Sequence, residues 1–216
     1  MTRNDSLYST LIDKRLIPVI KITDADNSEA LADALVTGGL SVAEVTFRTS
    51  CASEVIARMK HSRPGMFVGA GTVLSVSQVD DAVHAGADFI VAPGFDRAVV
   101  ERSLELGVPV VPGCVTPSEI SAALSMGLST VKFFPASSFG GAATIKALSA
   151  PFPGLNFIPT GGIDMHNLRE YTSMECVLAV GGSFMATEKL IEAQAWDEIA
   201  ARTRAAITEA ANTNRT

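Results

Sequence analysis

The stretch GVPVVPGCVTPSEISAALSMGLSTVKFFP, residues 107–135, contains one complete strand–helix–strand repeat. Its two apolar runs, residues 108–111 and 130–134, are rich in Val and Phe, as buried strands are. Between them, the sequence TPSE at 116–119 has the pattern of a capping box, with proline at the first helical position. Gly127 then stands where a left-handed residue ends a helix. Two strands joined by one helix in so short a segment predict a parallel βαβ unit.

The same alternation occupies most of the chain. Runs typical of strands lie at residues 16–22, 42–47, 66–70, 89–92, 108–111, 130–134, 155–159 and 176–180. Stretches with apolar residues three and four positions apart separate these runs and predict helices. Eight strands that alternate with helices predict an α/β fold, a (β/α)8 TIM barrel, formed by residues 1–216 as one domain. An open doubly wound sheet is the alternative, and it requires a reversal of strand order of which the sequence contains no sign.

Two further features fit a barrel. Gly39, Gly86, Gly107 and Gly127 each fall just before a predicted strand, where a helix ends in a left-handed residue. A helical stretch at residues 6–14 precedes the first strand, and we expect this extra N-terminal helix to cover the floor of the barrel.

The composition excludes several classes of protein. Of the 216 residues, 47% are hydrophobic and 19% charged, which is typical of a globular protein. The net charge of −6 argues against a nucleic-acid partner, and no apolar run is long enough to cross a membrane. Residues 1–6 lack the apolar core of a signal peptide. The cysteines, Cys51, Cys114 and Cys176, form neither a disulfide framework nor a zinc motif, so we expect reduced thiols and a cytoplasmic location.

One lysine stands inside a predicted buried strand. Lys132 lies in the apolar run at 130–134. Burying an ammonium group is costly unless it is paired or loses its charge. A neutral amine is a nucleophile that forms Schiff bases with carbonyl substrates. Lys132 is therefore either a compensated structural residue or the reacting group of an enzyme.

Strand alternation places other polar residues on the same face as this lysine. Glu44 and Arg48, in and after the run at 42–47, alternate with apolar residues and are expected to face the barrel interior, as Lys132 does. In one interpretation they form a buried Lys–Glu ion pair with an arginine at the rim. In the other, Lys132 attacks a ketone, Glu44 moves protons and Arg48 binds a carboxylate.

Glycines follow the last two predicted strands. Gly161-Gly162 and Gly181-Gly182-Ser183 stand where barrels of this type commonly bind phosphate, because glycine lets backbone N–H groups approach an anion. The alternative is two tight turns without a ligand. Lys21, at the end of the first strand, is either a substrate contact or a rim charge.

These motifs together resemble one family. The matching segments are IPVI at 17–20, EVTFRT at 44–49, GAGTVL at 69–74, APG at 92–94, PG at 112–113 with TPSE at 116–119, KFFPA at 132–136, PTGGI at 159–163 and GGS at 181–183. In their order and spacing, they are similar to those of the 2-keto-3-deoxy-6-phosphogluconate (KDPG) aldolases. This family consists of class I lyases that often also cleave 4-hydroxy-2-oxoglutarate (KHG).

The resemblance implies a function and a set of site residues. It implies reversible cleavage of KDPG to pyruvate and glyceraldehyde 3-phosphate, and of KHG to pyruvate and glyoxylate, without metal or other cofactor, by a homotrimer. Lys132 is then the Schiff-base lysine, Glu44 the acid/base, and Arg48 and Thr72 the residues that hold the pyruvate carboxylate. The other implied substrate-binding residues are Pro93, Phe134 and Thr160, which line the pocket, and Gly161, Gly162, Gly182 and Ser183, which hold the phosphate.

Three alternatives stay open at this point. The substrate could be the galactonate-derived epimer, which differs at a single hydroxyl. A phosphate-binding isomerase or epimerase would have no use for an interior lysine. A non-catalytic sugar-phosphate sensor would bind its ligand without covalent trapping. Lys21 also departs from the family pattern, in which an apolar residue is common after the first strand motif.

Overall fold

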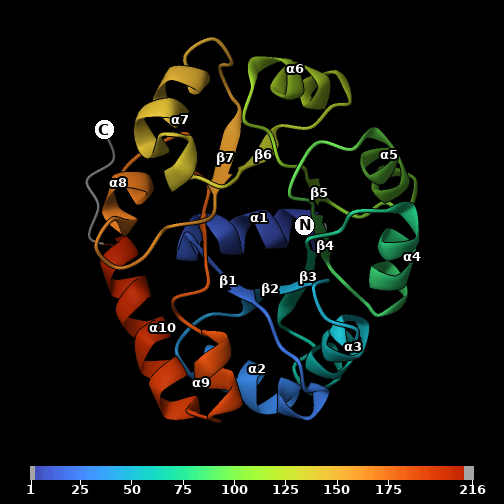
Figure 1. Cartoon of the computed structure of the whole chain (residues 1–216), viewed down its shortest axis with the longest axis vertical. Helices are drawn as coiled ribbons and strands as arrows, with labels where there is room; N and C mark the ends of the chain where they lie inside the picture. Colours follow the sequence, from blue (N-terminus) through green and yellow to red (C-terminus); the bar gives the residue numbers. More distant parts are fainter. Residues whose placement is uncertain (1–2, 212–216) are drawn as a thin grey trace.

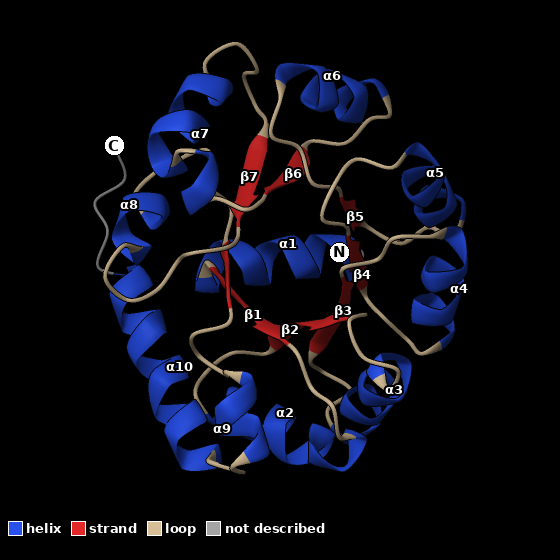
Figure 2. Cartoon of the chain, viewed as in Figure 1, coloured by secondary structure: helices blue, strands red, loops and turns tan. Residues whose placement is uncertain are grey.

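The computed structural model describes residues 3–211, in which a ring of strands is surrounded by helices (Figures 1 and 2). The strands are β1 (Leu16–Ile20), β2 (Val42–Thr46), β3 (Phe67–Gly71), β4 (Phe89–Val91), β5 (Val110–Val111), β6 (Thr130–Phe133), β7 (Asn156–Pro159) and β8 (Val180–Gly182). The α-helices are α1 (Arg3–Lys14), α2 (Ser28–Thr37), α3 (Ala52–Ser62), α4 (Val76–His84), α5 (Arg97–Glu105), α6 (Pro117–Ser125), α7 (Gly141–Ser149), α8 (Leu168–Thr172), α9 (Glu188–Glu192) and α10 (Trp196–Ala211). Two short 3-10 helices are η1 (Ala25–Asn27) and η2 (Ser137–Phe139).

The strands close into a parallel barrel. One sheet has the order β5-β4-β3-β2-β1-β8, and β6 pairs with β7 in a second sheet. Isolated parallel bridges join the two sheets: Gly113 with Lys132 on one side, and Phe157 with Val177 and Thr160 with Gly181 on the other. The predicted TIM-barrel fold is thus confirmed, and the open doubly wound sheet is wrong because the first and last strands are neighbours.

Helix α1 lies across one end of the ring (Figure 1). Tyr8 and Leu11 of this helix meet Ile17, Val111 and other strand residues around a small apolar space inside the barrel. The predicted helix at residues 6–14 is observed over Arg3–Lys14 and covers the barrel floor as expected.

Alternating burial explains why the strands form a barrel. Ala43 and Val45 of β2 point outward into the layer of apolar side chains shared with the helices, where they join Leu35 of α2 and Ile56 of α3. Glu44, between them in sequence, points inward and is buried. The period of two thus separates an apolar outer face from an inner face that can carry polar groups.

Seven of the eight described strands match the predicted runs to within two residues at each end, and the last does not. Strand β5 is limited to Val110–Val111 because Pro109 and Pro112 on either side have no N–H to donate. Strand β8 is Val180–Gly182, later than the predicted run at 176–180. Gly181 and Gly182 therefore lie within the strand and not in the turn after it. The side chain of Thr160 occupies the space that a Cβ on Gly181 would need, which explains a glycine in this strand.

The described helices include none with both the length and the apolar character that crossing a bilayer requires.

Candidate active site

The inner face of the barrel brings two oppositely charged side chains together. Lys132 on β6 and Glu44 on β2 are both buried, and Lys132 Nζ donates a hydrogen bond to Glu44 Oε1 over 3.1 Å. The two side chains are 6% and 2% exposed. Because water is excluded, each charge depends on the other for compensation. Strand alternation predicted that the two residues share the lumen, and the structure places them in direct contact.

Glycine at the end of β3 makes room for the carboxylate. A Cβ on Gly71 would overlap the side chain of Glu44. The next residue, Thr72, has a φ of 55°, in the left-handed region that β-branched residues avoid. Strained backbone of this kind is concentrated at functional sites, where the surrounding structure enforces it.

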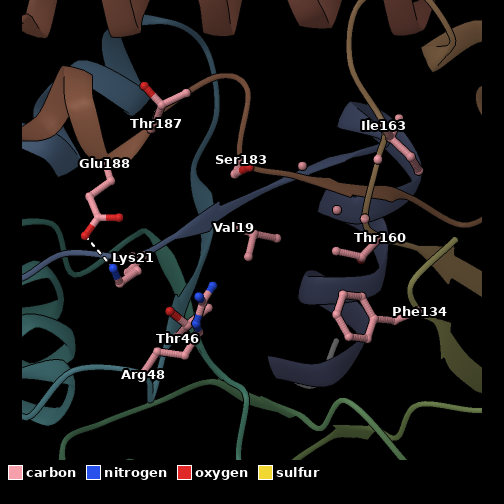
Figure 3. Close-up of a pocket in the computed structure, with 15 residues that line it drawn as sticks. Val19, Lys21, Thr46, Arg48, Phe134, Thr160, Ile163, Ser183, Thr187 and Glu188 are labelled. Atoms are coloured by element: carbon pink, nitrogen blue, oxygen red, sulfur yellow. Dashed lines mark hydrogen bonds and ion pairs between the residues drawn. The ribbon is translucent and has the colours of Figure 1, made fainter. Parts of the chain in front are cut away.

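A cavity of about 300 Å³ opens at the carboxyl ends of the strands (Figure 3). Its lining includes seven of the residues expected to bind substrate, namely Arg48, Phe134, Thr160, Gly161, Gly162, Gly182 and Ser183. It also includes residues that were not assigned to the site, namely Val19, Thr46, Ile163, Gly181, Ala186, Thr187 and Glu188, and Lys21, whose role stayed open. This end of the strands is where TIM barrels carry their active sites.

The lysine lies just beneath this cavity. Its Nζ is 5.4 Å from the centre of the Phe134 ring, over the ring face, and Phe134 itself lines the cavity. Lys132 and Glu44 are not among the lining residues. Neither are Thr72 and Pro93, which follow β3 and β4 at the same end of the barrel.

Two polar groups in the cavity have no protein partner among the described residues. Arg48 is exposed and takes part in no hydrogen bond or ion pair there. The Oγ1 atom of Thr160 is buried and also lacks a hydrogen-bond partner. The Thr160 side chain packs against Gly181, and a buried hydroxyl without a partner is costly.

Two side-chain hydrogen bonds fix the glycine pair that follows β7. Gly161 and Gly162 have φ values of 98° and 72°, which side chains rarely adopt. The carbonyl oxygen of Gly162 accepts hydrogen bonds from Ser137 Oγ at 2.7 Å and from Asn167 Nδ2 at 2.9 Å. Sequence reasoning identified the glycines but missed these two supports, because they come from η2 and from the loop before α8 and belong to no motif.

An ion pair stands at the mouth of the cavity. Lys21 Nζ is 2.6 Å from Oε1 of Glu188, which lies in the first turn of α9. The glutamate was not predicted, since its contact with Lys21 depends on how the chain folds after β8.

Cys114 is close to the lysine but is not poised to react. Its backbone N–H donates to the carbonyl oxygen of Lys132 over 2.8 Å, and its side chain is buried. Burial, helped by the charge of Glu119, raises the pKa of the Cys114 thiol to about 12. The thiolate is the nucleophilic form of cysteine, so this residue remains unreactive near neutral pH.

Sequence comparison identifies relatives along almost the whole chain. A family model described as KDPG and KHG aldolase matches residues 7–202. The 2-dehydro-3-deoxy-phosphogluconate aldolase of Haemophilus influenzae is 44% identical over 193 residues, which cover 89% of this chain and 91% of that protein. The KHG/KDPG aldolase of Escherichia coli is 37% identical over 202 residues, or 94% and 95% of the two chains.

Structural comparison agrees. A crystal structure of KDPG aldolase from Legionella pneumophila, with pyruvate captured as a covalent carbinolamine intermediate, superimposes with a TM-score of 0.89 at 37% identity, covering 92% of this chain and 97% of that one. Fold and relatives together define a class I aldolase, a carbon–carbon lyase whose Schiff-base mechanism needs no metal. The chain belongs to the KDPG and KHG aldolase family.

Proposed function

We propose that this aldolase reversibly cleaves KDPG to pyruvate and glyceraldehyde 3-phosphate, with Lys132 as the Schiff-base residue. The observation that carries the proposal is the buried contact of 3.1 Å between Lys132 Nζ and Glu44 Oε1. A carboxylate at hydrogen-bond distance can take a proton from the ammonium and leave a neutral amine, which is the nucleophile that the reaction needs.

The amine of Lys132 then attacks the C2 ketone carbon of the substrate and forms a carbinolamine. Glu44, now protonated, returns a proton to the departing hydroxyl, and loss of water leaves an iminium ion. The bond between C3 and C4 breaks with its electron pair moving to the iminium nitrogen, while the proton of the C4 hydroxyl passes to Glu44 directly or through a water. Glyceraldehyde 3-phosphate leaves as the aldehyde.

The remaining enamine takes a proton from Glu44 at C3, and hydrolysis of the resulting iminium releases pyruvate and restores Lys132. One carboxylic acid thus serves each proton transfer in turn, which requires that it stay beside the amine. The close packing of Gly71 against Glu44 supports this role, because it restricts where the carboxylate can lie.

Arg48 and Thr72 are proposed to bind the carboxylate of the substrate. The guanidinium of Arg48 lines the cavity and has no ion-pair partner among the described residues, and its planar donors match a carboxylate. The strained φ of 55° at Thr72 supports a positioned contact there. Pro93, Phe134 and Thr160 are proposed to enclose the reacting carbons.

The phosphate is proposed to occupy the other end of the cavity, against Gly161, Gly162, Gly182 and Ser183. All four residues line the cavity, and the first two have φ values of 98° and 72°, which glycine adopts readily because it has no Cβ. Backbone N–H groups at such glycines bind anions.

Further parts of the proposal rest on the family. KHG is proposed as a second substrate, cleaved to pyruvate and glyoxylate, because the E. coli relative is named a KHG/KDPG aldolase. We propose one domain, a homotrimer and a cytoplasmic location. Exposed apolar side chains such as Leu74, at 59% exposure, support an oligomer, and free thiols at Cys51, Cys114 and Cys176 support a reducing compartment.

A coupled assay tests the activity. The purified protein is mixed with KDPG, and released pyruvate is followed through NADH oxidation by lactate dehydrogenase. We expect steady release that a variant with Lys132→Met lacks. Binding of KDPG without release of pyruvate would support the non-catalytic sugar-phosphate sensor instead.

A further inference from the structure

The interior face of β1 leads toward the mouth of the cavity. Ile17 lines the small apolar space at the barrel floor, whereas Val19 and Lys21 line the large cavity above it. Ile20, between the last two, is fully buried among the apolar side chains outside the barrel. Lys21 is therefore directed into the cavity by the alternation of the strand and is not a chance surface charge.

Stability does not account for the ion pair that Lys21 forms. Its Nζ lies 2.6 Å from Glu188 Oε1, but the two side chains are 34% and 37% exposed. Pairs this accessible to water contribute little to folding. What the pair does is hold the ammonium at a defined place: in Figure 3 it stands on the side of the cavity away from Phe134 and Thr160.

The ammonium group of Lys21 has N–H donors left for a ligand. A lysine has three N–H donors, and the described structure uses one of them, toward Glu188. Two donors remain for a bound anion in the cavity. Lys21 and Arg48 are the two cationic side chains among the residues that line it, and Glu188 is the one anionic side chain. The lining therefore carries a net positive charge, suited to a ligand with more than one anionic group.

We propose that Lys21 is a specificity-determining residue that binds the phosphate end of the substrate from the side opposite Thr160, while Glu188 holds it in position. The inference rests on the proposed function, since it concerns the phosphate group of that substrate. Arg48 then serves the carboxylate and Lys21 the phosphate, so each anionic group of the substrate meets its own cation.

Comparing a phosphorylated with an unphosphorylated substrate tests the proposal. Lys21→Met removes the charge and keeps the length of the side chain, and Lys21→Arg keeps the charge. The matched control is Lys14→Met at the opposite end of the barrel, because Lys14 is also 34% exposed and is paired with Asp13 at 2.9 Å. For each protein, KM and kcat are measured for KDPG cleavage, and KM for pyruvate is measured through deuterium exchange of its methyl group.

We expect Lys21→Met to raise KM for KDPG about tenfold, the loss typical of a charged hydrogen bond, with little change in kcat. The KM for pyruvate, which has no phosphate, should stay near the value of the unmodified protein. Lys21→Arg should recover most of the KDPG affinity, and Lys14→Met should change neither KM.

Two results would overturn the role of Lys21: an unchanged KM for KDPG in Lys21→Met, or an equal rise in both KM values. A third variant, Glu188→Gln, removes the negative charge and keeps a hydrogen-bond acceptor. We expect its KM for KDPG to equal or fall below that of the unmodified protein, whereas a rise as large as that of Lys21→Met would mean that the pair only shapes the cavity wall. Failure of the unmodified protein to exchange pyruvate would instead count against the proposed function.

Discussion

Lys132 Nζ and Glu44 Oε1 lie 3.1 Å apart inside the barrel, although the two residues are 88 positions apart in the sequence. Neither side chain is more than 6% exposed. Such a pair contributes little net stability compared with apolar residues of the same size, yet loss of one partner leaves a buried charge. The proposed function gives the pair its reason, since a proton donor and acceptor are then held together for one reaction.

Replacing Lys132 with methionine should abolish turnover and destabilise the protein. The substitution removes the amine and leaves the carboxylate of Glu44 buried without a partner, which costs about 3–5 kcal/mol. Urea denaturation followed by circular dichroism measures the stability, and pyruvate release measures the activity. The double variant Lys132→Met/Glu44→Gln should regain part of the stability and none of the activity. Turnover in either variant would contradict the role of Lys132.

Glu44→Gln should slow the proton transfers and still permit some imine formation. Glutamine keeps the shape and a hydrogen-bond acceptor but cannot exchange a proton, so we expect deuterium exchange of pyruvate to fall by roughly 100-fold to 10,000-fold. Exchange is followed by NMR of the methyl group. Glu101→Gln, at an exposed i,i+4 pair with Arg97, is the control and should change nothing. Exchange at the original rate in Glu44→Gln would exclude this residue as the acid/base.

Gly71→Ala tests whether the position of the carboxylate matters. The added methyl group would overlap Glu44, so we expect a loss of about 1–3 kcal/mol in the free energy of unfolding and a fall in kcat. Gly65→Ala is the matched control, because a Cβ at that glycine meets no atom within 4 Å. If Gly71→Ala retains full kcat, the account of how β3 positions Glu44 is wrong.

The thiol of Cys114 should resist alkylation until the protein unfolds. Burial, with the charge of Glu119, raises the pKa of Cys114 to about 12, whereas the thiol of an unfolded chain ionises at about pH 8.5. Between about pH 8.5 and pH 12, the thiol of Cys114 therefore stays protonated in the folded protein but ionises in the unfolded chain. The contribution of Cys114 to the free energy of unfolding consequently falls as the pH rises above about 8.5. Mass spectrometry after iodoacetamide treatment at that pH should find Cys114 labelled only in urea. Rapid labelling of Cys114 in the folded protein would show that burial does not protect this thiol.

The features that could be predicted from the sequence are those that depend on a short-range pattern of residues. Alternation in β2 and β6 was sufficient to bring Glu44 and Lys132 to one lumen, because the period of two fixes which face a residue occupies. The capping box at Thr116 and Glu119 is present as expected, since it is local. Only the last strand was misplaced, where Gly181 and Gly182 concealed a strand whose missing side chains make room for Thr160 and Phe184.

The contacts that the sequence did not predict depend on how loops approach one another in the folded chain. Glu188 contacts Lys21 across 167 positions, and Ser137 reaches the carbonyl of Gly162 from 25 positions away. Neither contact has a periodic signal, because each is set by the path of the chain after a strand ends. The contact that holds Lys21 beside Glu188 could therefore be recognised only from the folded structure.

The most direct test of the account is covalent trapping. The protein is incubated with pyruvate and sodium borohydride, its intact mass is measured, and the modified peptide is mapped. We expect one reduced pyruvate adduct per chain, on Lys132, and none in Lys132→Met. A folded protein that gains no adduct, or gains it on another lysine, would contradict the assignment of Lys132 as the Schiff-base residue.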